Sequence, residues 1–221
     1  MPLLLSDQLF APQGTSCHGC ERLLLPSESL LCHNCQTDLF RSRIPRPERI
    51  VRLDDDRVPA FSAYWYEGMA RQMVLGLKYR HDVPAAALLS GAICTVFQET
   101  RPEGRWLATA VPAHPIRLLE RGYNQAQLLA MGFCRMMDIP LEADLLRRIR
   151  FEDSQVHRDR KQRYRAMQGA FASTRPLHGE NILLIDDVLT TGATVTACAR
   201  ELRKSGAGEI LVLTVCRAEK W

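Results

Sequence analysis

Three features are missing from the 221-residue sequence, and each absence argues against a class of protein. The chain contains no apolar run of 18 residues, the length that a transmembrane helix needs. Residues 1–11 lack both a basic start and a long apolar segment, so we expect no secretory signal, no membrane insertion and a cytoplasmic location. The motif G-x-x-x-x-G-K-[ST] is also absent, which argues against a P-loop nucleoside triphosphatase.

The sequence also has little excess charge. A net charge of +4 is too small by itself to predict nucleic-acid binding. The charge is unevenly distributed, because residues 147–165 carry eight basic and three acidic side chains, a local net charge of +5. This basic segment is either a surface for a phosphate backbone or a solvated polar loop.

The content of hydrophobic residues, 46%, is sufficient for a sizeable core. At this length we expect one main domain and a small appendage. Four of the eight cysteines form two CxxC pairs, and the other four lie within apolar segments, at Cys94, Cys134, Cys198 and Cys216. This distribution predicts a reducing compartment, one metal site and four buried thiols.

The two CxxC pairs follow the pattern C-x2-C-x11-C-x2-C within the first forty residues. Two such turns present four thiolates tetrahedrally, as a closed structural zinc site requires. Disulfides or a redox pair are the alternatives. His18 and His33 are expected to face solvent, because four sulfurs already fill the coordination shell. The predicted zinc ligands are Cys17, Cys20, Cys32 and Cys35.

The segment from Ile182 to Thr194 carries the most informative chemistry. Four aliphatic residues, 182–185, predict a strand buried on both faces, and Asp186 and Asp187 follow it. The next residues offer hydroxyls and backbone N–H groups at a helix N-terminus, which favours a phosphate group. Paired carboxylates suit Mg²⁺ or sugar hydroxyls. The predicted phosphate-binding residues are Thr190, Thr191, Gly192, Ala193 and Thr194.

The run IDDVLTTGAT resembles the 5-phosphoribosyl 1-diphosphate (PRPP) motif of type I phosphoribosyltransferases. The whole chain resembles the ComF/GntX branch of that family. Four motifs in order carry this resemblance: the N-terminal CxxC pairs, a central RGYNQ, a Gln- and Arg-rich loop, and the PRPP motif. A buried strand followed by a threonine-capped helix with no ligand is the alternative interpretation of the last motif.

The resemblance implies an α/β fold of the type I phosphoribosyltransferase class, with a central, mostly parallel sheet and a small zinc-ribbon-like module. We expect the zinc module in residues 1–45, a connector in 46–60, and the phosphoribosyltransferase-like domain in 61–221. Asp54–Asp56 is expected to be a solvated turn of the connector. The expected strands and helices cover residues 60–66, 69–78, 84–97, 107–111, 125–137, 182–185, 195–204 and 209–216.

For the site, the resemblance implies Mg²⁺-dependent displacement of diphosphate from PRPP by a nitrogen nucleophile. Asp186, Asp187 and Arg121 would be the catalytic residues. Arg117 and Lys78 would bind PRPP together with the threonine-rich loop, although Lys78 also suits the C-terminus of a helix for its charge alone. The zinc module stands where other members keep a base-binding hood, so the acceptor is not identified.

Members of the ComF branch are associated with natural transformation and the use of external DNA, which implies single-stranded DNA and the DNA-uptake machinery as partners. The candidate DNA-binding residues are Arg160, Lys161, Arg163 and Arg165. The same segment also matches the mobile loop that closes over diphosphate in the family, around Gln155 and Arg158. Both roles are compatible, because a PRPP site can regulate DNA binding instead of catalysing transfer.

Overall fold

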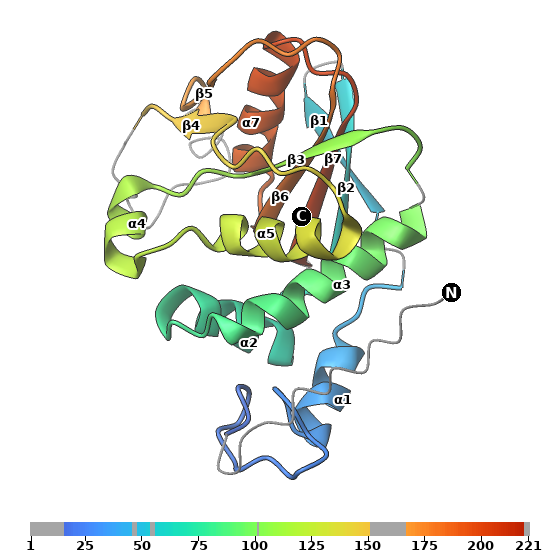
Figure 1. Cartoon of the computed structure of the whole chain (residues 1–221), viewed down its shortest axis with the longest axis vertical. Coiled ribbons are helices and arrows are strands. Elements are labelled where there is room, and N and C mark those ends of the chain that lie inside the picture. Colours follow the sequence, from blue (N-terminus) through green and yellow to red (C-terminus); the bar gives the residue numbers. More distant parts are fainter. Residues whose placement is uncertain (1–15, 46–47, 54–55, 101, 151–166, 219–221) are drawn as a thin grey trace.

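The computed structural model describes residues 16–45, 48–53, 56–100, 102–150 and 167–218 (Figure 1). The predicted DNA-binding residues of the basic segment and its Gln155 lie outside these described residues. Among the described residues, no helix combines the length and the apolar character that crossing a bilayer needs.

The central feature is a five-stranded sheet with the order β1-β2-β7-β6-β3. Four strands run parallel: β2 (Asp56–Trp65), β7 (Ile210–Arg217), β6 (Asn181–Leu189) and β3 (Trp106–Ala110). The edge strand β1 (Glu48–Leu53) is antiparallel to β2. The prediction of an α/β fold with a mostly parallel central sheet is confirmed.

The segment expected to be a connector, residues 46–60, contains β1 and the first half of β2, paired in a register that places Val51 opposite Val58. The prolines and aspartates in this segment suggested an irregular chain, but an edge strand is stabilised by the ladder with its neighbour more than by local preference.

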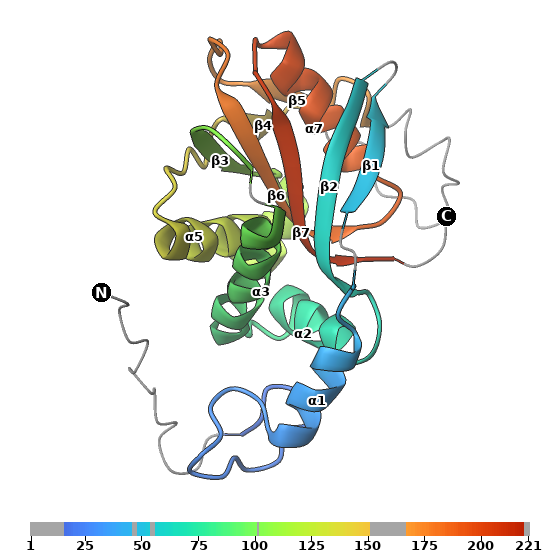
Figure 2. The ribbon, with the colours of Figure 1, turned by 90° about the vertical axis from the view of Figure 1, so that its right-hand side faces the viewer.

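Helices cover both faces of the sheet (Figure 2). One face carries α3 (Pro84–Thr100) and α5 (Gln125–Met137), which also pack against each other. The other face carries α7 (Ala193–Lys204), next to the small sheet of β4 (Leu146–Arg148) and β5 (Phe171–Ser173). Because both faces are covered, the four aliphatic residues at the start of β6 are fully buried, as their sequence predicted.

The cysteine-containing segment and two helices lie beyond the carboxyl ends of the parallel strands (Figure 2). These helices are α1 (His33–Arg41) and α2 (Gly68–Tyr79). Leu31 is buried in the same apolar cluster as Met69 of α2. The cysteine module therefore packs directly on the main domain, at the edge of the sheet where ligands bind in parallel α/β folds.

A short helix, α4 (Pro115–Arg121), follows β3. His114 caps it, since its Nδ1 accepts a hydrogen bond of 3.3 Å from the N–H of Ile116. Pro115 occupies the first turn, where its missing N–H costs nothing. Pro115 therefore starts a helix.

Candidate functional site

A cavity of about 230 Å³ lies at the carboxyl ends of β3 and β6. Its lining residues come from α2, the segment after β3, α4, the start of α5, β4, β6 and α7. The structure brings together most of the residues that the sequence singled out. Those lining this cavity are Lys78, Arg117, Arg121, Asp186, Asp187 and Thr194.

The two carboxylates occupy the last part of β6, which runs on to Leu189. Side chains alternate between the faces of a strand, so the two leave β6 in different directions. Asp187 reaches towards α2, where its Oδ2 lies 2.7 Å from Nζ of Lys78. Asp186 is held by a 2.8 Å hydrogen bond from the N–H of Asp187 to its Oδ1.

The pKa values in this group reflect two acids that share one base. Burial raises the pKa of Asp186, and the neighbouring charge of Asp187 raises it further. Burial opposes the charge on Lys78, but the carboxylates of Asp187 and Asp186 outweigh it, so the pKa of Lys78 is raised. Lys78 compensates one carboxylate, and the raised pKa of Asp186 favours its neutral form in the absence of a bound cation. Oxygen-only donors of this kind suit a hard cation such as Mg²⁺, or the hydroxyls of a sugar.

The threonine-rich loop connects β6 to α7. Gly192 has φ of 74°, a left-handed conformation that suits glycine, and α7 begins at the next residue. The hydroxyl of Thr191 accepts a 3.4 Å hydrogen bond from the N–H of Ala193. A small hollow over this helix start is lined by Asp186, Thr190, Gly192, Ala193 and Thr194. The binding of phosphate here stays a prediction, and the loop stands beside the carboxylates as that prediction requires.

Arg117 and Arg121 lie one turn apart on α4. Arg117 pairs with Glu120 at 2.7 Å, on the exposed side of the helix. Arg121 donates a 2.9 Å hydrogen bond to Oε1 of Gln125, and its guanidinium stacks on the ring of Tyr79 at 5.1 Å from the centroid. Arg121 is thus held in place from two sides at the cavity wall.

The RGYNQ motif has a role that sequence reasoning missed. Asn124 caps α5, because its Oδ1 accepts a hydrogen bond from the N–H of Ala126. Its Nδ2 donates a 3.0 Å hydrogen bond to the carbonyl of Val111, just after β3. The hydroxyl of Tyr123 donates 2.6 Å to the carbonyl of Leu77 in α2. The motif therefore joins three elements that surround the cavity.

Arg148 was counted in the sequence only as part of the basic segment. It lies instead on β4 and lines the cavity together with Asp186. Burial lowers the pKa of its guanidinium. The sequence alone did not distinguish Arg148 from the two other arginines within residues 147–150, because only the position of β4 shows which of them reaches the cavity.

The four predicted metal ligands form one cluster. Their Sγ atoms all lie within 4.8 Å of one another, and Cys20 and Cys32 are 3.7 Å apart. Tetrahedral bonds of about 2.3 Å require sulfur atoms about 3.8 Å apart. Backbone N–H groups donate to the sulfurs, and that of Cys35 lowers the pKa of Cys32, which favours the thiolate. None of the eight cysteines, which all lie within the described residues, forms a disulfide.

Two side chains fix the cysteine module in place. Glu28, 8% exposed, accepts hydrogen bonds from the N–H groups of Leu25 and His33 and pairs with Arg22. His18 was expected to face solvent, but its Nδ1 lies 2.5 Å from Oδ1 of Asp82, just after α2. His33 is exposed, as predicted. The module therefore makes a polar contact with the segment that carries Lys78.

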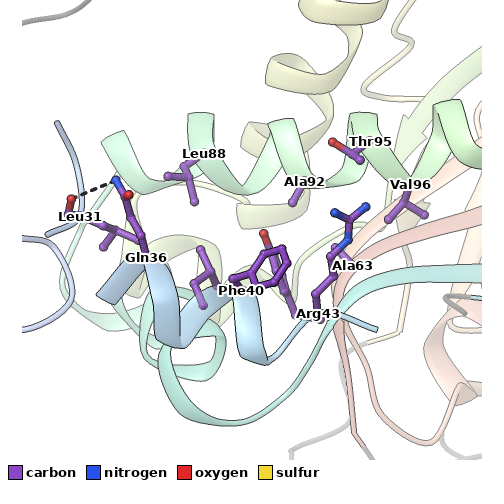
Figure 3. A pocket seen from close by; sticks show the side chains of 11 residues that line it. Leu31, Gln36, Phe40, Arg43, Ala63, Leu88, Ala92, Thr95 and Val96 are labelled. Atoms are coloured by element: carbon purple, nitrogen blue, oxygen red, sulfur yellow. Dashed lines mark hydrogen bonds between the residues drawn. The ribbon is translucent and has the colours of Figure 1, made fainter. Parts of the chain in front are cut away.

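A second pocket, of about 240 Å³, lies between α1, β2 and α3 (Figure 3). Its walls are mainly apolar and include Phe40, Leu88 and Val96. None of the residues predicted from the sequence as site residues lines it. The chemistry expected of the chain thus belongs to the first cavity.

The pair between Lys78 and Asp187 makes a first prediction. The side chains are only 21% and 12% exposed, so Lys78→Met leaves a nearly buried carboxylate without its cation. We expect the free energy of unfolding to fall by about 2 kcal/mol, measured by urea denaturation in Mg²⁺-free buffer. The double variant Lys78→Met/Asp187→Asn should recover most of the loss.

Lys204→Met, at an exposed position of α7, is the matched control and should change the free energy of unfolding by less than about 0.5 kcal/mol. Equal stability of Lys78→Met and the wild type would show that the ion pair is not formed in solution.

A family model described as "Phosphoribosyl transferase domain" matches residues 119–220, which include α5, β6, α7 and β7. Among solved structures, glutamine phosphoribosylpyrophosphate amidotransferase from B. subtilis matches 58% of this chain and 26% of its own, with 18% identity and a TM-score of 0.39.

Three curated relatives illustrate the sequence similarity. "DNA utilization protein YhgH" of Salmonella typhimurium is 28% identical over 204 residues, covering 90% of this chain and 83% of the relative. "Competence protein ComFC" of Bacillus subtilis is 26% identical over 224 residues, covering 95% and 87%. "Competence protein F" of Haemophilus influenzae is 35% identical over 111 residues, covering 49% and 48%.

Proposed function

Because the chain belongs to the ComF family of proteins with a phosphoribosyltransferase-like fold, we propose that it binds PRPP together with Mg²⁺ in the cavity at the ends of β3 and β6. The observation that carries this proposal is the pair Asp186 and Asp187 beside the start of α7, in a cavity that arginines of α4 and β4 also line. One cavity thus holds both acceptors and donors, as a sugar joined to phosphate groups requires.

In this proposal, each part of PRPP contacts a different group of residues. The carboxylates of β6 accept hydrogen bonds from the ribose hydroxyls and hold Mg²⁺. The loop of Thr190–Thr194 binds the 5-phosphate through N–H groups and hydroxyls at the N-terminus of α7. Arg117 and Arg121 compensate the charge of the diphosphate. Lys78 orients Asp187 through their ion pair.

Group transfer at this site follows from the same arrangement. A nitrogen nucleophile forms a bond to carbon 1 of the ribose, the bond from carbon 1 to the diphosphate oxygen breaks, and diphosphate leaves with the bonding electrons. Bound Mg²⁺ supplies charge compensation to the leaving diphosphate. Arg117 and Arg121 stabilise the same developing charge, and the carboxylates hold the sugar so that carbon 1 faces the nucleophile.

The cysteine cluster, in the same proposal, holds one zinc ion. Four sulfurs fill the coordination shell, so this zinc is structural and has no open position for catalysis. Its site lies next to α2, through the contact between His18 and Asp82. We expect Cys94, Cys134, Cys198 and Cys216 to contribute no ligands, because all four are buried outside the cluster.

A second function is favoured by the relatives, whose names refer to competence and DNA utilisation. In this alternative the protein binds single-stranded DNA, and PRPP regulates binding instead of being consumed. The candidate contacts, Arg160, Lys161, Arg163 and Arg165, lie outside the described residues. DNA binding through four cations would fall with salt with a log–log slope of about −0.7 per phosphate neutralised.

One titration series separates the two functions. We expect PRPP to bind in calorimetry with Mg²⁺ present and at least tenfold more weakly without it. The titration is then repeated with single-stranded DNA, and free diphosphate is assayed. Release of diphosphate only when a nitrogen acceptor is present supports transfer, whereas a shift in DNA affinity without release supports regulation. Equal PRPP binding with and without Mg²⁺ contradicts the proposed site.

A further inference from the structure

Gln125, the first residue of α5, is buried at the wall of the cavity but only half satisfied. It is 4% exposed, and its Oε1 accepts a 2.9 Å hydrogen bond from Arg121. Its Nε2 has no hydrogen-bond partner among the residues that the structure describes. A buried amide donor without a partner costs free energy, so such a group at a cavity wall points to a ligand.

Arg121, which is hydrogen-bonded to Gln125, also has a buried donor without a partner among the described residues. Nε of Arg121 is also buried and has no hydrogen-bond partner within the described part of the chain. The neighbouring amide of Asn124 is different, because its oxygen caps α5 and its nitrogen is bound to Val111. Arg121 and Gln125 line the same cavity, and each has one buried donor without a partner in the described ranges.

The open donors and the carboxylates that line this cavity suit different parts of a ligand. Asp186 and Asp187 accept hydrogen bonds and suit hydroxyls or a cation, whereas Gln125 Nε2 can only donate and suits an acceptor oxygen. An anionic phosphate oxygen accepts hydrogen bonds and does not donate. A ligand that bears hydroxyls at one end and phosphate oxygens at the other matches this arrangement.

From these contacts we infer that Gln125 binds an oxygen of the diphosphate through Nε2, while its Oε1 positions Arg121 against the same group. This inference rests on the proposed binding of PRPP and adds a residue that distinguishes PRPP from ribose 5-phosphate. The amide donor recognises the diphosphate end of the ligand, and the loop before α7 recognises the 5-phosphate end.

Gln125→Glu tests the contact. The glutamate has the same shape and still accepts from Arg121, but it replaces the amide donor by a negative charge facing the diphosphate. The probes are PRPP, inorganic diphosphate and ribose 5-phosphate, each titrated with Mg²⁺. We expect at least a tenfold loss of affinity for PRPP and for diphosphate, and less than a twofold change for ribose 5-phosphate.

Gln127→Glu is the matched control, because it makes the same charge change two residues along α5 at a position that does not line the cavity. It should leave all three affinities within twofold of the wild type. Thermal unfolding of each variant checks that the fold is kept. Gln125→Met, which removes both donor and acceptor, should weaken PRPP and diphosphate binding as well.

Three results would overturn the inference. Wild-type PRPP affinity in Gln125→Glu, combined with weak binding in Gln125→Met, would show that Gln125 acts only by positioning Arg121. An equal loss for ribose 5-phosphate would show that the substitution disturbs the whole cavity. Wild-type protein that binds none of the three probes would overturn the proposed function, and the role of Gln125 with it.

Discussion

Replacing both Asp186 and Asp187 by asparagine is expected to reduce the Mg²⁺-dependent affinity for PRPP by a hundredfold or more. Each charge-assisted hydrogen bond to a ribose hydroxyl contributes about 1.5–3 kcal/mol, and two are weakened at once. The variant also loses the negative charge that holds Mg²⁺. Asparagine keeps the size of the side chain and an oxygen for Lys78, so the fold should be retained. Calorimetry with PRPP and Mg²⁺ measures the loss.

Asp144→Asn is the control for this experiment, because Asp144 is exposed and does not line the cavity. Its affinity for PRPP should equal that of the wild type. An unchanged dissociation constant in the double variant of β6 would refute the role of the two carboxylates, provided that circular dichroism shows both proteins folded.

Removal of the metal from the cysteine cluster is expected to unfold the module of residues 17–42. Structural zinc contributes about 10–16 kcal/mol in isolated zinc-finger peptides at neutral pH, and a module this small has little core of its own. The module also contacts α2, since a Cβ on Gly19 would lie 2.7 Å from the sulfur of Met69. We expect Cys17→Ser/Cys32→Ser to lose its zinc and the amide protection of both the module and α2.

The measurements are elemental analysis and hydrogen exchange. Cys94→Ala, at a buried cysteine outside the cluster, should retain one zinc per chain and the exchange protection of the module. Purified wild-type protein that contains no zinc, with the four thiols titrating as free groups, would contradict the account of this centre.

Much of the site was predictable because its residues are close together in the sequence. The strand, the two carboxylates and the helix start lie within residues 181–193, so their order along the chain could be predicted from the sequence. The same holds for the cysteines, whose spacing alone predicted the cluster now seen at 3.7 Å between Cys20 and Cys32. Residues of such local motifs are close in the sequence and stay close in the folded structure.

Contacts between distant residues were not predictable from one sequence. Lys78 suited the end of a helix equally well, and only the fold shows its 2.7 Å contact with Asp187, more than a hundred residues away. Gln125 suited a helix start, and its open donor becomes visible only when the cavity is formed. The local sequence specifies the type of a side chain, while the sheet order decides which side chains meet.

The structures of β1 and of the start of α4 were not predicted, for a related reason. The residues of β1 gave no clear period, and their strand exists through its ladder with β2. Two prolines at positions 112 and 115 favour a loop by local preference. Pro115 nevertheless occupies the first turn of α4, the part of a helix that tolerates proline. In both cases the residue preferences were correct, and the structural context selected the less common outcome.

A crystal structure of the protein with PRPP and Mg²⁺ tests the central claim most directly. We predict that the ribose hydroxyls and the metal lie at Asp186 and Asp187, that the 5-phosphate lies over Thr190–Thr194, and that the diphosphate faces Arg121 and Gln125. Density for PRPP elsewhere, such as in the pocket between α1 and α3, or no density at saturating ligand, would contradict the account.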